Sequence, residues 1–129
     1  MSLFNFFGND NKDTASSKME WNGLTNLSQL HEIIKESNDS PILIFKHSTR
    51  CSISRFALKQ FENEFNLDGK IKPYFLDLLE HRDISDEIAQ LFGVQHQSPQ
   101  IIVIKDGAAV YDASHQDIEA QKLNAVITN

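Results

Sequence analysis

The chain has 129 residues, 40% of them hydrophobic and 23% charged, with a formal net charge of −6 and a pI near 5.2. This length suits one domain with a single core. An acidic chain lacks the basic surface that phosphate binding requires, so we expect no nucleic-acid partner. No apolar run approaches the roughly 20 residues that cross a bilayer, and we expect no membrane association. The single cysteine, Cys51, excludes an internal disulfide and favours a cytoplasmic location.

Residues 1–18 are expected to be a flexible leader ahead of a domain that spans residues 19–129. Residues 8–18 contain no apolar side chain larger than alanine, so they cannot contribute to a core. Residues 3–7 are apolar, but they are too short for a signal peptide and no basic residue precedes them.

Alternating helical and strand patterns follow the leader. Asn26 and Gln29 resemble a capping box, and the apolar stripe after them predicts a helix that ends before Pro41. The apolar run 42–45 predicts a strand, over residues 42–47, that is buried on both faces. A second helix is predicted from the turn at Cys51 to about residue 67. Its aromatic stripe is expected in the core and consists of Phe56, Phe61 and Phe65 together with Leu58.

The second half of the chain repeats the alternation and then changes pattern. Residues 71–78 predict a strand, and the apolar stripe from Ile84 to Phe92 predicts a helix that Gly93 closes. The β-branched run 100–104 and the pair Asp106-Gly107 predict a tight hairpin to a strand at 108–111. Ser114 and Asp117 form a second candidate capping box, for a last helix that reaches the end of the chain.

This order of elements predicts an α/β fold of the thioredoxin-like type. The expected architecture is a three-layer sandwich: a mixed sheet with a parallel core and an antiparallel C-terminal hairpin, and helices on both faces. In such a fold the active site lies where the strand 42–47 enters the helix that follows the cysteine.

Cys51 is the candidate catalytic nucleophile. The unpaired amides and the dipole at the start of a helix favour an anion such as a thiolate. Four cations lie in the fourteen residues 46–59, which contain no Asp or Glu: Lys46, Arg50, Arg55 and Lys59. The alternative, that Cys51 is a buried small apolar side chain, remains open at this point.

Ser54 occupies the position where a dithiol oxidoreductase of this architecture needs a second cysteine. Residues three apart meet on one helix face, so the second thiol there would resolve a mixed disulfide. A hydroxyl cannot form a disulfide. The sequence therefore predicts a monothiol cycle, in which Cys51 attacks a disulfide and a separate thiol releases it.

Four segments together resemble the monothiol bacilliredoxin family of YtxJ-like proteins. They are residues 45–54 (FKHSTRCSIS), 74–79 (YFLDLL), 82–85 (RDIS) and 94–100 (VQHQSPQ). The resemblance extends from about Trp21 to the C-terminus. It implies a cytosolic enzyme that uses Cys51 to remove bacillithiol, a thiol that some bacteria use in place of glutathione, from protein mixed disulfides. The family often has proline after the cysteine, where this chain has Ser52.

Several residues are candidates for supporting the thiol: Thr49, Arg50, Ser52, Ser54, Ser98 and Pro99. Thr49 and Arg50 either contact a bound thiol or are turn residues with solvated side chains. From the fold we expect the Ser98–Pro99 bond to be cis and to face the cysteine. Asp77 either assists proton transfer near the thiol or caps a loop.

We expect bacillithiol as the co-substrate, no bound cofactor or metal, and a monomer. His47 and His96 are at positions more typical of hydrogen-bonded or exposed side chains than of metal ligands. Two alternative functions remain: an iron–sulfur cluster carrier that borrows external thiols, and a thioredoxin-like adaptor without turnover.

Overall fold

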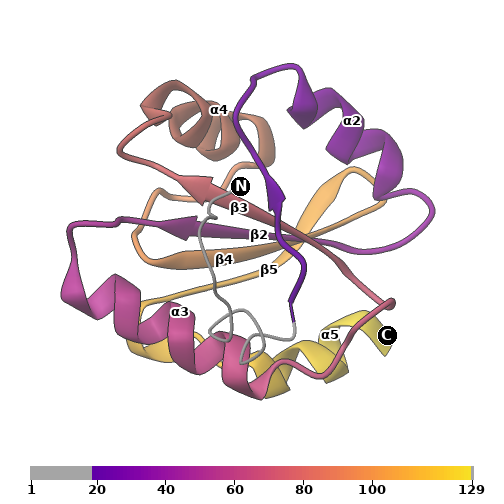
Figure 1. The fold of residues 1–129 in the computed structure, drawn as a ribbon. Helices are drawn as coiled ribbons and strands as arrows, with labels where there is room; N and C mark the ends of the chain where they lie inside the picture. Colours follow the sequence, from indigo (N-terminus) through magenta and orange to yellow (C-terminus); the bar gives the residue numbers. More distant parts are fainter. Residues whose placement is uncertain (1–18, 129) are drawn as a thin grey trace.

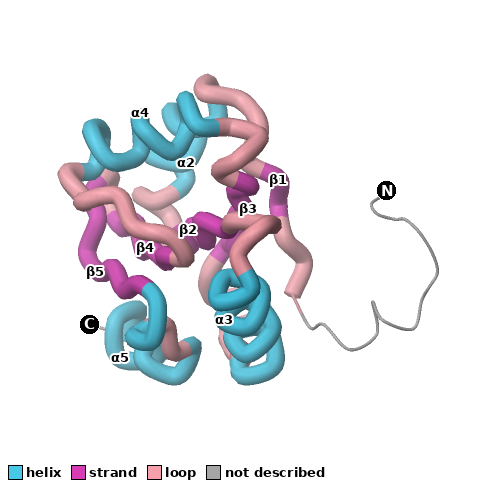
Figure 2. The backbone as a smooth tube through the Cα atoms, turned by 90° about the vertical axis from the view of Figure 1, so that its left-hand side faces the viewer, coloured by secondary structure: helices cyan, strands magenta, loops and turns pink. Residues whose placement is uncertain are grey.

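The computed structural model describes residues 19–128, so the expected leader lies outside the described residues. A five-stranded sheet, in the order β1-β3-β2-β4-β5, lies between two pairs of helices (Figure 1). Helices α2 and α4 cover one face and α3 and α5 cover the other, as the view in Figure 2 shows. The predicted α/β three-layer architecture is confirmed.

The helices and strands follow one another in the order predicted, with one additional short strand at the start. They are β1 (Asn22–Gly23), α2 (Gln29–Glu36), β2 (Ile42–His47), α3 (Ser52–Glu64), β3 (Lys72–Asp77), α4 (Arg82–Phe92), β4 (Gln100–Lys105), β5 (Ala108–Ser114), two 3-10 helices (His115–Asp117 and Ala120–Lys122) and α5 (Leu123–Thr128). β3 pairs parallel with both β1 and β2, whereas β4 pairs antiparallel with β2 and β5. Asp106 and Gly107 have φ values of 51° and 79°, which fit the tight hairpin turn predicted there.

Strand β2 is the centre of the sheet, and its side chains alternate between two cores. Ile42 and Ile44 join the cluster under α2 and α4, and Leu43 and Phe45 join the cluster over α3 and α5. The last two residues of the strand, Lys46 and His47, are polar but are buried like the apolar residues before them. The carboxyl end of β2 therefore carries polar groups into the interior at the point where the Cys51 turn begins.

Helix α3 corrects the prediction that its aromatic stripe lies wholly in the core. Ser54, Phe61 and Phe65 face inward, at the spacing of one helix face. Phe56 lies on the opposite side of the helix and is 71% exposed. The prediction placed every aromatic residue of the helix in the core, but Phe56 is not on the helix face that carries the buried residues.

Both predicted capping boxes need correction. The backbone N–H of Asn26 donates to Gln29 as predicted, but the Asn26 side chain accepts from Ser28, and α2 begins only at Gln29. Ser114 makes no side-chain cap at all. It is still paired with Gln100 in the sheet, so the chain after it forms 3-10 turns before a short α5.

We expect Phe61→Ala to lower the free energy of unfolding by about 3–5 kcal/mol, because it empties a site that is 1% exposed and packed against the rings of Phe45 and Phe65. Phe56→Ala is the matched control on the same helix, with an expected cost under about 0.5 kcal/mol. Urea unfolding measures both. Equal costs would contradict the phase assigned to α3.

Candidate active site

Cys51 is the N-cap residue of α3, at the carboxyl end of β2. Its backbone N–H donates to the carbonyl oxygen of Ser48 at 3.2 Å, which closes the turn. Its own carbonyl accepts the N–H of Arg55 at 3.1 Å, the first bond of the helix. Cys51 is half-buried, so solvent and a small disulfide can reach it, and it is not a buried apolar side chain.

Ser54 is fully buried and joins the cysteine turn to the strand beneath it. Its Oγ accepts the backbone N–H of Ser48 at 3.0 Å and lies 2.7 Å from Nδ1 of His47. Burial lowers the pKa of His47, with Asp77 opposing that shift and Arg55 adding to it. We assign a neutral imidazole whose Nδ1 accepts the Ser54 hydroxyl proton. The Ser54 hydroxyl thus accepts one hydrogen bond, from Ser48, and donates another, to His47.

The outer side of the turn carries three of the predicted supporting residues. Thr49, Arg50 and Ser52 are exposed around Cys51. The guanidinium Nη1 of Arg55 donates to the carbonyl oxygen of Thr49 at 3.1 Å. Arg55 therefore helps to fix the turn.

Pro99 lies at the same end of the sheet. The Ser98–Pro99 bond is cis, as expected, and Pro99 is buried. Gln100 pairs with Lys46 across β4 and β2, so Pro99 is level with the end of β2, from which the cysteine turn departs. The carbonyl oxygen of Pro99 accepts the N–H of His115 at 3.0 Å.

The loop before Pro99 is held by two buried polar residues: Gln100, which sequence reasoning did not assign to the site, and Lys46, which it counted among the cations near Cys51. Nζ of Lys46 lies 2.7 Å from Nδ1 of His96, to which the ammonium donates. The Gln100 amide donates to the carbonyl of Gln95 at 3.0 Å and accepts the N–H of Gln97 at 3.4 Å. The available signal was a lysine and a glutamine next to the apolar runs of two strands.

The burial of Lys46 is costly for its charge. Desolvation lowers its pKa from the ordinary 10.5 to about 8, although the charge of Asp86 opposes the shift. His96 also has a lowered pKa, first through burial and then through the charge of Lys46. The two shifts agree with an ammonium that donates to a neutral imidazole.

Asp77 is opposite His47 in the pairing of β2 with β3. Its Oδ1 accepts the N–H of Leu79 at 3.1 Å, so it caps the loop after β3, one of the two roles expected for it. Within residues 19–128, no three His, Cys, Asp or Glu side chains gather closely enough to hold a metal ion.

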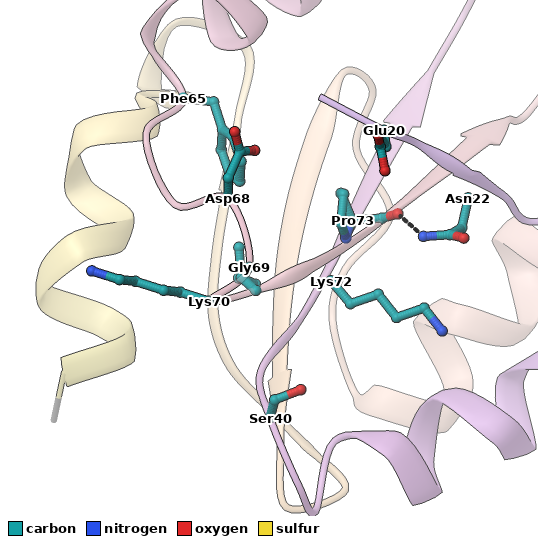
Figure 3. Close-up of a pocket in the computed structure, with 10 residues that line it drawn as sticks. Glu20, Asn22, Ser40, Phe65, Asp68, Gly69, Lys70, Lys72 and Pro73 are labelled. Carbon is teal, nitrogen blue, oxygen red and sulfur yellow. Dashed lines mark hydrogen bonds between the residues drawn. The ribbon is translucent and has the colours of Figure 1, made fainter. Parts of the chain in front are cut away.

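A hollow of about 490 Å³ lies at the other end of the sheet, away from the cysteine (Figure 3). It is lined by residues that precede β2 and begin β3, including Ser40, Lys72 and Pro73. Asn22 donates to the carbonyl oxygen of Pro73, and both residues line the hollow. None of the predicted site residues lines this hollow, so the candidate site is the opposite end.

We expect Lys46→Met to change how stability depends on pH. Between pH 8 and 10.5 an unfolded chain keeps a proton on Lys46 that the folded chain has lost, so the free energy of unfolding of the wild-type chain rises with pH in this window. Met carries no such proton. The wild-type chain should therefore gain about 3 kcal/mol relative to the variant across the window, measured by urea unfolding. A constant difference would show that Lys46 is not buried as an ammonium.

In residues 19–128, none of the helices is both long and apolar enough to span a membrane.

Comparison with solved structures supports the fold. A protein described as a candidate oxidoreductase with a thioredoxin fold is 33% identical, with a TM-score of 0.69 over 80% of this chain and 89% of that chain. Thioredoxin from Malassezia sympodialis is 18% identical, with a TM-score of 0.66 over 87% of this chain and 91% of its own. Fasciola hepatica thioredoxin is 20% identical, with a TM-score of 0.63 over 82% and 95%.

The sequence model of the family described as monothiol bacilliredoxin BrxC matches residues 22–123. The match contains β1 to β5, the cysteine turn and the cis-proline loop. Together with the similar oxidoreductase, it supports a thiol redox role and an oxidoreductase activity. The chain belongs to the monothiol bacilliredoxin family.

Proposed function

We propose that this protein removes bacillithiol from protein mixed disulfides through the single thiol of Cys51. The supporting observation is the pairing of a half-exposed cysteine at the start of α3 with a buried serine three residues later. Ser54 fills the place of a resolving thiol and is bonded to His47 and Ser48. A redox cycle at this site therefore needs an external second sulfur.

The proposed cycle has two exchanges. The Cys51 thiolate attacks the bacillithiol sulfur of the mixed disulfide, the old S–S bond breaks, and its electron pair leaves on the client sulfur, which takes a proton from water. A second low-molecular-weight thiol, as its thiolate, then attacks the Cys51 adduct. This step frees Cys51 and forms a small-molecule disulfide.

The surroundings of Cys51 suit these steps. The first-turn amides of α3 favour the attacking thiolate, and Thr49, Arg50 and Ser52 surround it on the exposed side. Ser98 and Pro99 are proposed to lie against the client chain. A cytoplasmic location, a monomeric state and the absence of a bound cofactor belong to the same proposal.

We expect transfer of bacillithiol from a client protein to Cys51, seen by intact-mass spectrometry as loss of the adduct from the client and its gain on this chain. Cys51→Ser is the control, because it keeps the size of the side chain but removes the nucleophile. A client that keeps its adduct while Cys51 gains none would show that the transfer mechanism is wrong. A brown protein after anaerobic purification would instead support the iron–sulfur carrier.

We further expect Ser54→Cys to convert the site to a dithiol. The two sulfurs would be one helical turn apart, within reach of a disulfide, so mild oxidation should remove two free thiols per chain. Lys59→Cys is the matched control, since its position on α3 is too far from Cys51 to bridge. Thiol titration before and after oxidation measures both. If both variants keep their thiols, the placement of residue 54 beside Cys51 is wrong.

A further inference from the structure

A polar cleft of about 460 Å³ lies beside the cysteine turn. One wall is formed by Thr49 and Arg50, the two residues before Cys51. The other side comes from the end of β3, the loop after it and the first residue of α4. A ligand in this cleft would therefore be next to the reacting sulfur, on one side of it.

The charged residues that line the cleft have both signs. Arg50 and Arg82 contribute two cations, and Asp77 and Glu80 contribute two carboxylates. Within residues 19–128, no ion pair joins any of these four side chains, whereas Lys72 and Glu36 elsewhere do pair, at 2.9 Å. Opposite charges that share a small cleft without pairing leave hydrogen-bonding capacity of both kinds for a bound molecule.

A mixed set of charges selects among thiols. An uncharged thiol would offer neither sign of charge a partner, and a purely anionic thiol would pair with Arg50 and Arg82 but would leave Asp77 and Glu80 without a cation. A thiol that carries both a carboxylate and an ammonium group can satisfy both signs. The cleft is also within the usual size range of small-ligand sites, roughly 300–1,000 Å³.

We propose that this cleft is the binding site for the small thiol, and that Arg82 and Glu80 select a thiol bearing carboxylate and amino groups. Arg50 and Arg82 bind the carboxylate, while Asp77 and Glu80 bind the ammonium group. Bacillithiol, glutathione and cysteine share this chemistry. The inference rests on the proposed function, since it concerns the thiol that Cys51 exchanges, and it adds residues from β3 and α4 to the site.

The test compares wild type, Arg82→Gln and Glu80→Gln in transfer from one client protein loaded with different thiols. The client carries bacillithiol, glutathione, cysteine or, as the uncharged reference, 2-mercaptoethanol, and intact mass gives the rate at which Cys51 gains each adduct. Loss of one charge-assisted contact should lower the ratio of the bacillithiol rate to the 2-mercaptoethanol rate about tenfold or more. The relative transfer rates of bacillithiol, glutathione and cysteine identify which of these thiols the cleft prefers.

Lys59→Gln is the matched control. It removes one positive charge from an exposed position on α3 that does not line the cleft. Its ratio should equal that of the wild type. If Lys59→Gln and Arg82→Gln lower the ratio equally, general attraction explains the effect, and the proposed cleft is wrong. An unchanged ratio in Arg82→Gln would overturn it too, while transfer by the wild type would still support the proposed function.

A binding measurement on a variant that cannot react distinguishes the proposed cleft from the proposed Cys51 mechanism. Cys51→Ser labelled with ¹⁵N is titrated with oxidised bacillithiol, which cannot react with it. Amide shifts at Arg50, Leu79 and Arg82 are expected, and Arg82→Gln in the same background should weaken them. Shifts without transfer in the wild type would support the cleft and reject the Cys51 mechanism. Transfer without shifts at these amides would reject the cleft.

Discussion

The hydrogen bonds of Ser54 are the constraint on which the candidate site depends. One buried hydroxyl accepts from the backbone of Ser48 and donates to His47, so it joins the turn, the helix and the central strand. Replacing it with an apolar group would leave a partly buried amide and a buried imidazole nitrogen unpaired, and an unpaired buried polar group costs about 1–3 kcal/mol. The serine therefore has a structural reason to be there, besides the absence of a second sulfur.

The two faces of β2 position two different loops. His47 points to the α3 side and holds the cysteine turn, while Lys46, next to it in the chain, points to the α4 side and holds the loop before Pro99 through His96. Side chains alternate along a strand, so two consecutive residues can serve two loops. The position of the cysteine turn relative to the cis-proline loop thus depends on the end of one strand.

The sequence predicted the elements that have strong periodicity and missed those that depend on tertiary contacts. Strand β2, helix α4 and the Asp106-Gly107 hairpin follow from apolar spacing and turn chemistry. Strand β1 has only two residues and forms because β3 offers it an edge. The turn at Cys51 and its place at the start of a helix were predictable from the sequence, but the partners of Lys46 and Ser54 were not, since they are brought together only by the fold.

The burial of Lys46 indicates that the end of β2 serves to position the loop beside the cysteine. Residues 42–45 of β2 are apolar, and a fifth apolar side chain at position 46 would avoid the desolvation that lowers the pKa of Lys46 to about 8. A charge kept at that cost needs compensation: the Asp86 charge favours the ammonium, and the hydrogen-bond partner of Lys46 is a loop residue, His96. An apolar residue would fill the space but could not reach His96 with a hydrogen bond. We infer that the strand end gives up stability to fix the loop beside the cysteine, as functional sites often do.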